Sequence, residues 1–160
     1  MQLNQSIISD IKSIIAQSRD RAIRAVDHQR TLMYWHIGKR IFEEEQEGKD
    51  RADYGKYLIK YLSEQLQPEF GSGFSVRQIN LYRQFYRTFE NVHTLYAQLS
   101  WSQYKLLLTV ENQDKREFYI AESVKNNWTS RQLERQKNSN LYERLLLSND
   151  KESVLAGEKL

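Results

Sequence analysis

The chain has 160 residues, enough for one domain with its own hydrophobic core. It contains no cysteine, which excludes disulfides, thiol catalysis and cysteine-ligated metal centres. It shows no signal-peptide pattern and no apolar run of about 18 residues, so we expect a cytoplasmic protein without a membrane span. The net charge of +3 arises entirely between residues 71 and 110, where four basic side chains accompany one acidic side chain.

The N-terminal third predicts one long helix from Asn4 to Glu47, which Gly38 weakens and the Gly48-Lys49-Asp50 break ends. Its apolar residues recur at helical spacing: Ile7, Ile8, Ile11, Ile14, Ile15, Ala22, Ile23, Val26, Leu32, Met33, Ile37 and Ile41. At 1.5 Å per residue this helix would be roughly 65 Å long, which exceeds a compact domain of this size.

Two arrangements can cover so long an apolar stripe. The helix can bend near Arg19-Asp20 or Asp27-His28 and fold back as a hairpin. Alternatively it can pack against a second chain, which predicts a homo-oligomer. The candidate interface residues for that second arrangement are Ile7, Ile11, Ile14 and Ile15.

Three later helix starts share one capping pattern. In each, a hydroxyl residue can accept a hydrogen bond from the third helical N–H, and a glutamine at that third position can bond back to the cap. An apolar residue before the cap can also pack on the fourth helical residue. The three segments are Phe74-Ser75-x-x-Gln78-Ile79, Leu99-Ser100-x-x-Gln103-Tyr104 and Trp128-Thr129-x-x-Gln132-Leu133. Each cap contributes about 1 kcal/mol.

The remaining elements follow from these starts, from Pro68 and from the absence of sustained strand alternation. We expect helices at about 54–67, 76–89, 101–110, 114–126 and 130–147, the last broken near Asn138–Asn140. The predicted fold is all-α: a long N-terminal helix followed by a helix-turn-helix-like helical bundle. We place the domain at residues 1–147, with residues 148–160 as a polar tail or linker.

The first candidate for nucleic-acid contact is the helix at 76–89, preceded by the helix at 54–67 and a turn of about seven residues. Its expected inward stripe is Val76, Ile79, Tyr82, Tyr86 and Phe89. An outward row recurs at i, i+3, i+7 and i+10, flanked by Arg83: it comprises Arg77, Asn80, Gln84 and Arg87. Arginine can bind guanine, and asparagine or glutamine can bind adenine. The alternative is an ordinary solvated helix face.

The second candidate is the segment 114–137, which has a shorter turn and so fits helix-turn-helix spacing better. Its outward side chains are Arg131 and Arg135, with Gln132 and Lys137 beside them. Neighbouring acids make the segment neutral, however, and the packing of a helical hairpin explains it equally well.

No catalytic or metal site emerges from the sequence. His28, His36 and His93 do not have zinc-ligand spacing, and Gly71-Ser72-Gly73 lacks the continuation of a phosphate loop. The three tryptophans are better explained as core residues than as stacking platforms for bases: they are Trp35, Trp101 and Trp128. We therefore expect no cofactor and no metal.

Several longer phrases resemble the N-terminal domain of the YhcG-like bacterial proteins, a domain of unknown function, from about residue 10 to residue 150. They are Leu32-Met33-Tyr34-Trp35-His36-Ile37-Gly38-Lys39-Arg40-Ile41, Arg51-Ala52-Asp53-Tyr54-Gly55-Lys56, Glu69-Phe70-Gly71-Ser72-Gly73-Phe74-Ser75, Gln98-Leu99-Ser100-Trp101-Ser102-Gln103-Tyr104, Arg116-Glu117-Phe118-Tyr119 and Asn127-Trp128-Thr129-Ser130-Arg131-Gln132-Leu133-Glu134-Arg135-Gln136. In longer members this domain precedes a nuclease-like domain of the PD-(D/E)xK class. The resemblance thus implies an all-helical, DNA-binding module attached to a nuclease.

The catalytic motif of that class is not apparent in this sequence. Pro68 is followed by Glu69, and Glu47-Gly48-Lys49 matches acid-x-lysine only by coincidence at a helix end. We therefore expect a non-catalytic domain that binds or positions DNA for a nuclease domain, fused in cis or acting in trans. The alternative is a protein-interaction or oligomerisation module that works through the long N-terminal helix.

Overall fold

The computed structural model describes residues 5–48 and 53–158, and within these ranges the only regular secondary structure is helical. The predicted all-α fold is therefore confirmed. The α-helices are α1 (Gln5–Glu47), α2 (Tyr54–Phe70), α3 (Val76–Thr88), α4 (Trp101–Leu108), α5 (Gln113–Asn126), α6 (Ser130–Asn138), α7 (Leu141–Leu147) and α8 (Lys151–Glu158). Short 3₁₀ turns at Ser72–Phe74 and Val92–Thr94 join α2 to α3 and α3 to α4.

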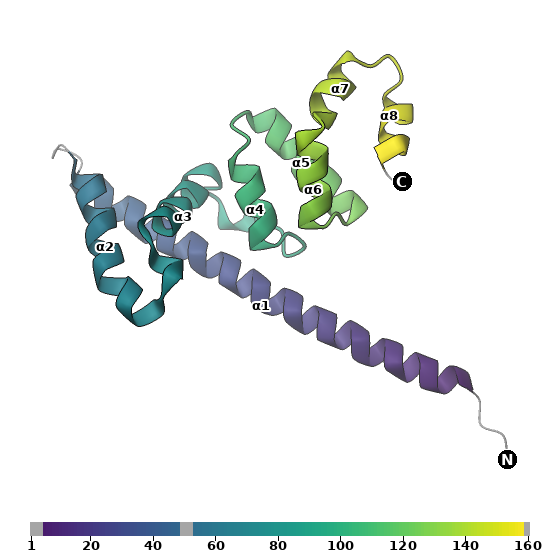
Figure 1. Ribbon diagram of the computed structural model, residues 1–160, viewed down its shortest axis with the longest axis horizontal. Helices are drawn as coiled ribbons and strands as arrows, with labels where there is room; N and C mark the ends of the chain where they lie inside the picture. The colour runs from purple at the N-terminus through teal and green to yellow at the C-terminus, as the bar shows by residue number, and fades with distance from the viewer. Residues whose placement is uncertain (1–4, 49–52, 159–160) are drawn as a thin grey trace.

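The first helix is a single 43-residue element, as the sequence predicts. Figure 1 shows it running past the other helices, with its N-terminal half projecting alone. Every residue from 5 to 26 is exposed. The alternative in which the chain bends and folds back near residue 27 is therefore wrong. Asn4, Lys49 and Asp50, at the predicted ends of this helix, lie outside the described residues.

The C-terminal half of α1 packs against α3, which runs antiparallel to it, far more extensively than any other pair of helices pack. The two backbones meet at Gly38. A Cβ atom at this position would lie 2.0 Å from the Tyr82 carbonyl oxygen and 3.2 Å from the Cβ of Tyr86. Glycine costs helix stability at an interior position. Here its missing side chain is what allows the two helices to come so close.

Aromatic side chains surround this crossing. The rings of Tyr34 and Tyr82 stack with centroids 4.4 Å apart, and Trp101 packs on both. The indole N–H of Trp35 donates to the Phe89 carbonyl oxygen at 2.6 Å, which fixes the C-terminal end of α3 on α1. Burial raises the pKa of Tyr82 well above its ordinary value. Its hydroxyl donates to the Gly73 carbonyl oxygen at 2.7 Å, which ties α3 to the turn before it.

Two of the three predicted capping boxes form completely, at Ser100 and at Thr129. At Ser75 the hydroxyl accepts from the Gln78 N–H, but no return bond from the Gln78 side chain is present in the described structure. Gln103 does more than close its box. Its side-chain oxygen accepts from the Ser100 N–H, and its side-chain nitrogen donates to the Trp128 carbonyl oxygen at 2.6 Å. This buried amide therefore links the starts of α4 and α6.

The larger core lies among α1, α3, α4, α5, α6 and α7 and includes the three tryptophans, which confirms their assignment to the interior. Tyr104 is buried in it, and this burial raises the pKa of its hydroxyl to about 12. The hydroxyl accepts from the Tyr96 N–H at 2.7 Å, which anchors the connection between α3 and α4.

The inward stripe predicted for α3 is wrong at two positions. Val76 is 45% exposed, whereas Phe85, which was not included, is fully buried. Val76 is the first residue of α3, before the crossing with α1, so no neighbouring helix covers it. Phe85 lies between Trp101 and Tyr104, with ring centroids 5.1 Å from each. The partner that buries it comes from α4 and was not visible in the periodicity of α3.

The predicted stop before Pro68 is also wrong, because α2 continues through Pro68 to Phe70. Proline removes one N–H and so leaves the Glu64 carbonyl without its helical donor. Both residues are exposed, so water can bond to that carbonyl. The helix ends at Gly71, whose φ of 86° favours glycine.

The C-terminal segment contains a helix that the sequence did not predict. α8 spans Lys151–Glu158, and its Val154 and Leu155 pack against the larger core. α7 is held by Leu141 and Leu145, which are buried. An ion pair of 2.6 Å between Lys115 and Glu143 also ties α7 to α5. The boundary at residue 147 between the domain and the polar tail stays a prediction.

Gly38→Ala tests the crossing. In an open helix this change stabilises by up to about 1 kcal/mol. Here the added methyl meets backbone atoms of α3, so we expect a loss of roughly 1–3 kcal/mol of unfolding free energy, or more. Urea denaturation measures it. Gly157→Ala is the matched control, because a Cβ there meets nothing within 4 Å. Equal stability of the two variants would contradict the proposed role of Gly38.

Candidate nucleic-acid interface

The outer face of α3 carries the row predicted from the sequence. Arg77 and Arg87 are exposed near opposite ends of the helix. Neither makes a hydrogen bond or an ion pair within the described part of the chain. Their guanidinium groups are therefore available to an external anion.

Other members of the row have partners within the fold. Arg83 pairs with Glu45 of α1, with its Nη1 atom 3.1 Å and 3.2 Å from the two carboxylate oxygens. The Gln84 side-chain nitrogen donates to the Leu108 carbonyl oxygen at 3.1 Å, at the end of α4. The contact with Glu45 neutralises Arg83. Asn80 is partly buried beside it.

These side chains line one open hollow of about 490 Å³, formed by Asn80, Arg83, Gln84, Arg87 and Thr88. The lining contains no acidic residue. The structure thus brings the predicted row together around a depression, with Arg77 outside it toward the start of α3. This shape differs from a freely protruding recognition helix, because α1 and the end of α4 flank the row.

The second candidate helix, α6, presents Arg131 and Arg135 to solvent. Gln132 is used in the capping box at Thr129 and is not a free contact residue. The Lys137 side chain donates to the Thr109 hydroxyl at the end of α4. Gln84 of α3 bonds to the neighbouring Leu108 carbonyl. The C-terminal ends of both candidate helices therefore approach the same end of α4.

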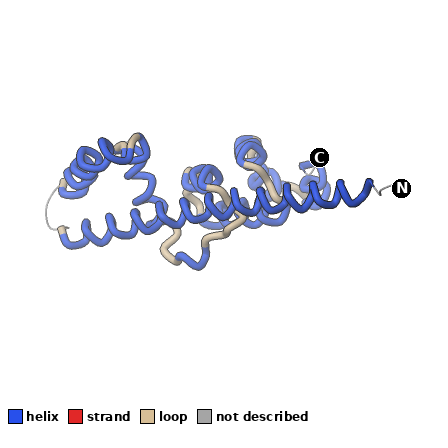
Figure 2. Tube along the Cα trace, turned by 90° about the horizontal axis from the view of Figure 1, so that it is seen from below, coloured by secondary structure: helices blue, strands red, loops and turns tan. Residues whose placement is uncertain are grey.

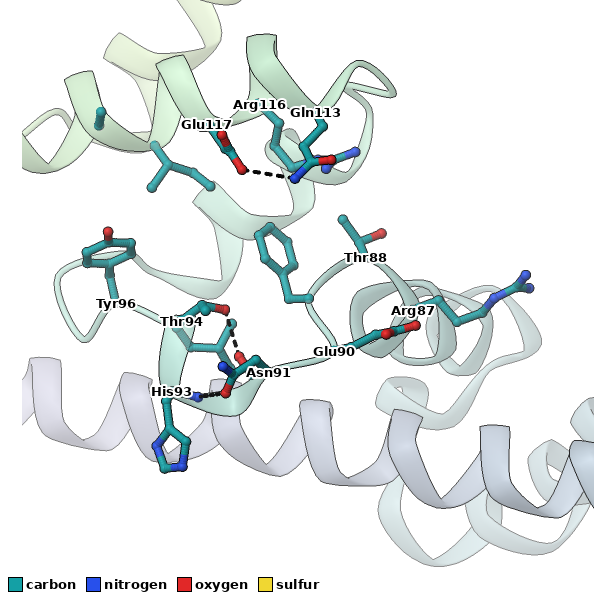
Figure 3. Close-up of a pocket in the computed structure, with 14 residues that line it drawn as sticks. Arg87, Thr88, Glu90, Asn91, His93, Thr94, Tyr96, Gln113, Arg116 and Glu117 are labelled. Atoms are coloured by element: carbon teal, nitrogen blue, oxygen red, sulfur yellow. Dashed lines mark hydrogen bonds between the residues drawn. The ribbon is translucent and has the colours of Figure 1, made fainter.

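A larger pocket of about 900 Å³ lies between the α3–α4 connection and α5, and sequence reasoning did not identify it. Figure 3 shows Gln113, Arg116 and Glu117 on the α5 side, facing the segment from Arg87 to Tyr96. Arg87 and Thr88 also line the α3 hollow, so the two depressions adjoin.

Arg116 is held in place within this pocket. It donates to the Val110 and Glu111 carbonyl oxygens at 3.2 Å, and its guanidinium lies 6.0 Å from the centre of the Phe89 ring. Glu117 accepts from the Gln113 side chain at 3.1 Å. Glu90 and Glu117 balance the two arginines, so the pocket itself is close to neutral. The only sequence signal for it was Arg116-Glu117-Phe118-Tyr119, quoted for its resemblance alone.

The residues proposed for self-association are placed on the projecting half of α1. The side chains of Ile7, Ile11, Ile14 and Ile15 are between 46% and 62% exposed. No other part of the described chain covers them, which leaves an apolar surface of the kind that marks an interaction site.

No group of three histidine, aspartate or glutamate side chains in the described residues is arranged to hold a metal ion. None of the described helices combines the length and the apolar character needed to cross a membrane.

The family described as "DUF1016 N-terminal domain" matches residues 10–144 of this chain. The chain belongs to this family. The match covers most of the sequence and agrees with the resemblance noted from the quoted phrases, and the helical fold described above is the structure of that domain. No solved structure matches the chain.

A curated relative is the protein named "Putative nuclease YhcG" from Escherichia coli (strain K12). The two are 35% identical over an alignment of 183 positions, which covers 94% of this chain and 49% of the relative. The chain therefore spans about half the length of this relative.

Proposed function

We propose that this chain is a non-catalytic domain that binds DNA and positions it for a nuclease domain, in cis or in trans. The observation that carries the proposal is the outer face of α3. Arg77 and Arg87 have no hydrogen-bond or ion-pair partner there among the described residues, and they lie in the section of the chain that holds all of its net positive charge. The name of the relative supports a nucleic-acid substrate for the longer protein.

The contacts at the end of α4 define the proposed extent of the surface. α3 reaches Leu108 through Gln84, and α6 reaches Thr109 through Lys137. Lys137 of α6 therefore lies at the end of α4 that α3 also reaches, and we include the exposed Arg131 and Arg135 of α6 as a further basic part of the proposed surface. Contacts of such side chains with the nucleic-acid backbone depend on charge and position rather than on base sequence.

The second candidate function is self-association through the N-terminal half of α1. A specific observation favours it: residues 5–26 are all exposed although they include five isoleucines between positions 7 and 15. The two functions are compatible, because the α3 row and this half of α1 are separate surfaces. A cytoplasmic location stays a prediction from the sequence.

The double variant Arg77→Ala/Arg87→Ala tests the α3 surface. We expect DNA affinity to fall roughly tenfold or more, and the salt dependence to weaken by about one unit of slope per lost phosphate contact. Stability should hardly change, because both side chains are exposed. Fluorescence anisotropy at several salt concentrations measures both quantities. Arg131→Ala/Arg135→Ala reports the contribution of α6. Unchanged affinity in a folded Arg77/Arg87 variant would remove α3 from the proposal.

The isolated chain is expected to leave DNA intact. Incubation of purified protein with supercoiled plasmid and Mg²⁺ or Mn²⁺, followed by gel electrophoresis, checks this. Glu47→Gln removes the acid-x-lysine match at Glu47-Gly48-Lys49 and serves as the comparison variant. Cleavage that persists through purification and disappears in a folded Glu47→Gln protein would overturn the non-catalytic assignment.

Ile11→Glu/Ile15→Glu tests self-association. Charges in an apolar interface are strongly unfavourable, so we expect the variant to dissociate at micromolar concentration while its helical content is kept. Sedimentation velocity and circular dichroism measure the two effects. The matched control is Ser13→Glu/Gln17→Glu, which adds the same charges at the same spacing on the opposite side of the helix. A monomeric native protein would show that this candidate function is wrong.

A further inference from the structure

One face of α1 remains apolar and exposed from its first turns to the crossing with α3. Five side chains form this apolar ridge, each between 46% and 61% exposed: Ile8, Ile11, Ile15, Val26 and Met33. Steps of 11 residues separate Ile15, Val26 and Ile37, and such a step is about three helical turns. These residues therefore lie along nearly one line. The ridge continues C-terminally to Ile37.

An apolar groove opens where the ridge ends. It lies between α1, α2 and the start of α3 and has a volume of about 380 Å³. In Figure 2, α1 and α2 lie beside each other and move apart, starting from the C-terminal end of α1 and the N-terminal end of α2. The apolar residues that line the groove are Ile37, Ile41, Leu58, Leu62, Leu66, Phe74 and Ile79, with Tyr61 beside them. The charged groups at this α1–α2 groove are Arg40 and Glu44, which pair with each other at 3.1 Å.

The N-terminal part of the ridge cannot reach the groove of its own molecule. Ile11 and Ile37 belong to the same continuous helix and are separated by 26 residues, which corresponds to about 39 Å. A helix presenting apolar residues at i, i+3 and i+7 is the usual occupant of such a groove. Ile8, Ile11 and Ile15 have this spacing.

We propose that two copies of this chain pair their α1 helices antiparallel, so that Ile8 and Ile11 of each copy occupy the α1–α2 groove of the other while Ile15 packs against Met33. This inference rests on self-association as the second candidate function and specifies its geometry. A parallel pair would bring the isoleucine ends together but leave both grooves open. The antiparallel pair fills both grooves with one closed, two-fold interface.

The two-fold axis of this dimer passes near residue 24, which is equidistant from Ile11 and Ile37. Ala22 lies near that point on the same face as the ridge. Its small side chain allows the two helices to approach closely near the centre of the pair. On either side, Ile15 of one copy faces Met33 of the other, and both are about half exposed in the single chain.

Cysteine crosslinking distinguishes the two orientations, because the natural chain contains no cysteine. One population carries Ile15→Cys and a size tag, and the other carries Met33→Cys. After mixing and mild oxidation, the antiparallel dimer should give a disulfide-linked heterodimer. Ile15→Cys alone should not crosslink, since its two copies would be about 27 Å apart along the helices, whereas a disulfide needs Cα atoms within about 7 Å.

Asn149→Cys, exposed near the C-terminus, reports crosslinking by random collision. Efficient crosslinking of Ile15→Cys with itself would show a parallel pair, which overturns this inference and leaves self-association intact. Both the inference and self-association are overturned if the native protein sediments as a monomer and the mixture of Ile15→Cys with Met33→Cys crosslinks no better than the Asn149→Cys control.

The groove has its own matched pair of variants. Tyr57 and Tyr61 are neighbouring, stacked and exposed tyrosines of α2, but only Tyr61 lines the groove. Tyr61→Glu should raise the dimer dissociation constant about tenfold or more, whereas Tyr57→Glu should change it by less than about twofold. Equal effects of the two substitutions would show that the groove is not part of the interface.

Discussion

The contact between α1 and α3 at Gly38 determines where the other parts of this molecule lie. Because Gly38 has no side chain, the Tyr82 backbone can lie directly against α1. This approach brings Tyr34 onto Tyr82 and the Trp35 indole to the end of α3. Trp101 then packs on the same aromatic group and connects it to α4. The smaller cluster around Ile41 and Ile79 extends the contact toward α2.

The same crossing defines the candidate interface. One side of α3 is fully occupied by α1, so its polar row faces outward. Arg83 and Gln84 are then drawn into contacts with Glu45 and with the end of α4. Arg77 and Arg87 are left without such contacts, and they become the residues on which the proposed DNA binding depends. In the sequence, the outward residues of α3 all looked alike. In the structure, some of them stabilise the fold and the others are available to bind a ligand.

The crossing also uses only half of α1. The other half carries isoleucines at helical spacing, but no element of the described chain reaches them. A helix this long gains little from its own hydrogen bonds, and most helical stability in proteins comes from packing of an apolar face. An antiparallel partner would supply that packing and would fill the groove beside α2 at the same time. DNA positioning by a dimer would then present two α3 surfaces related by a two-fold axis.

The sequence by itself determined the all-α class, the single long helix, the helix starts at Ser75, Ser100 and Thr129, and the interior position of the three tryptophans. These features depend on local hydrogen bonds and on residue spacing, and both involve residues that are close together in the sequence. It also predicted the outward row on α3. Only the tertiary structure decided that Gly38 is a contact point, that Phe85 rather than Val76 is buried, and that Arg83 is paired. It also revealed the pocket beside Arg116 and the groove beside Ile41. Each of these depends on which helix lies opposite, and that partner is distant in sequence.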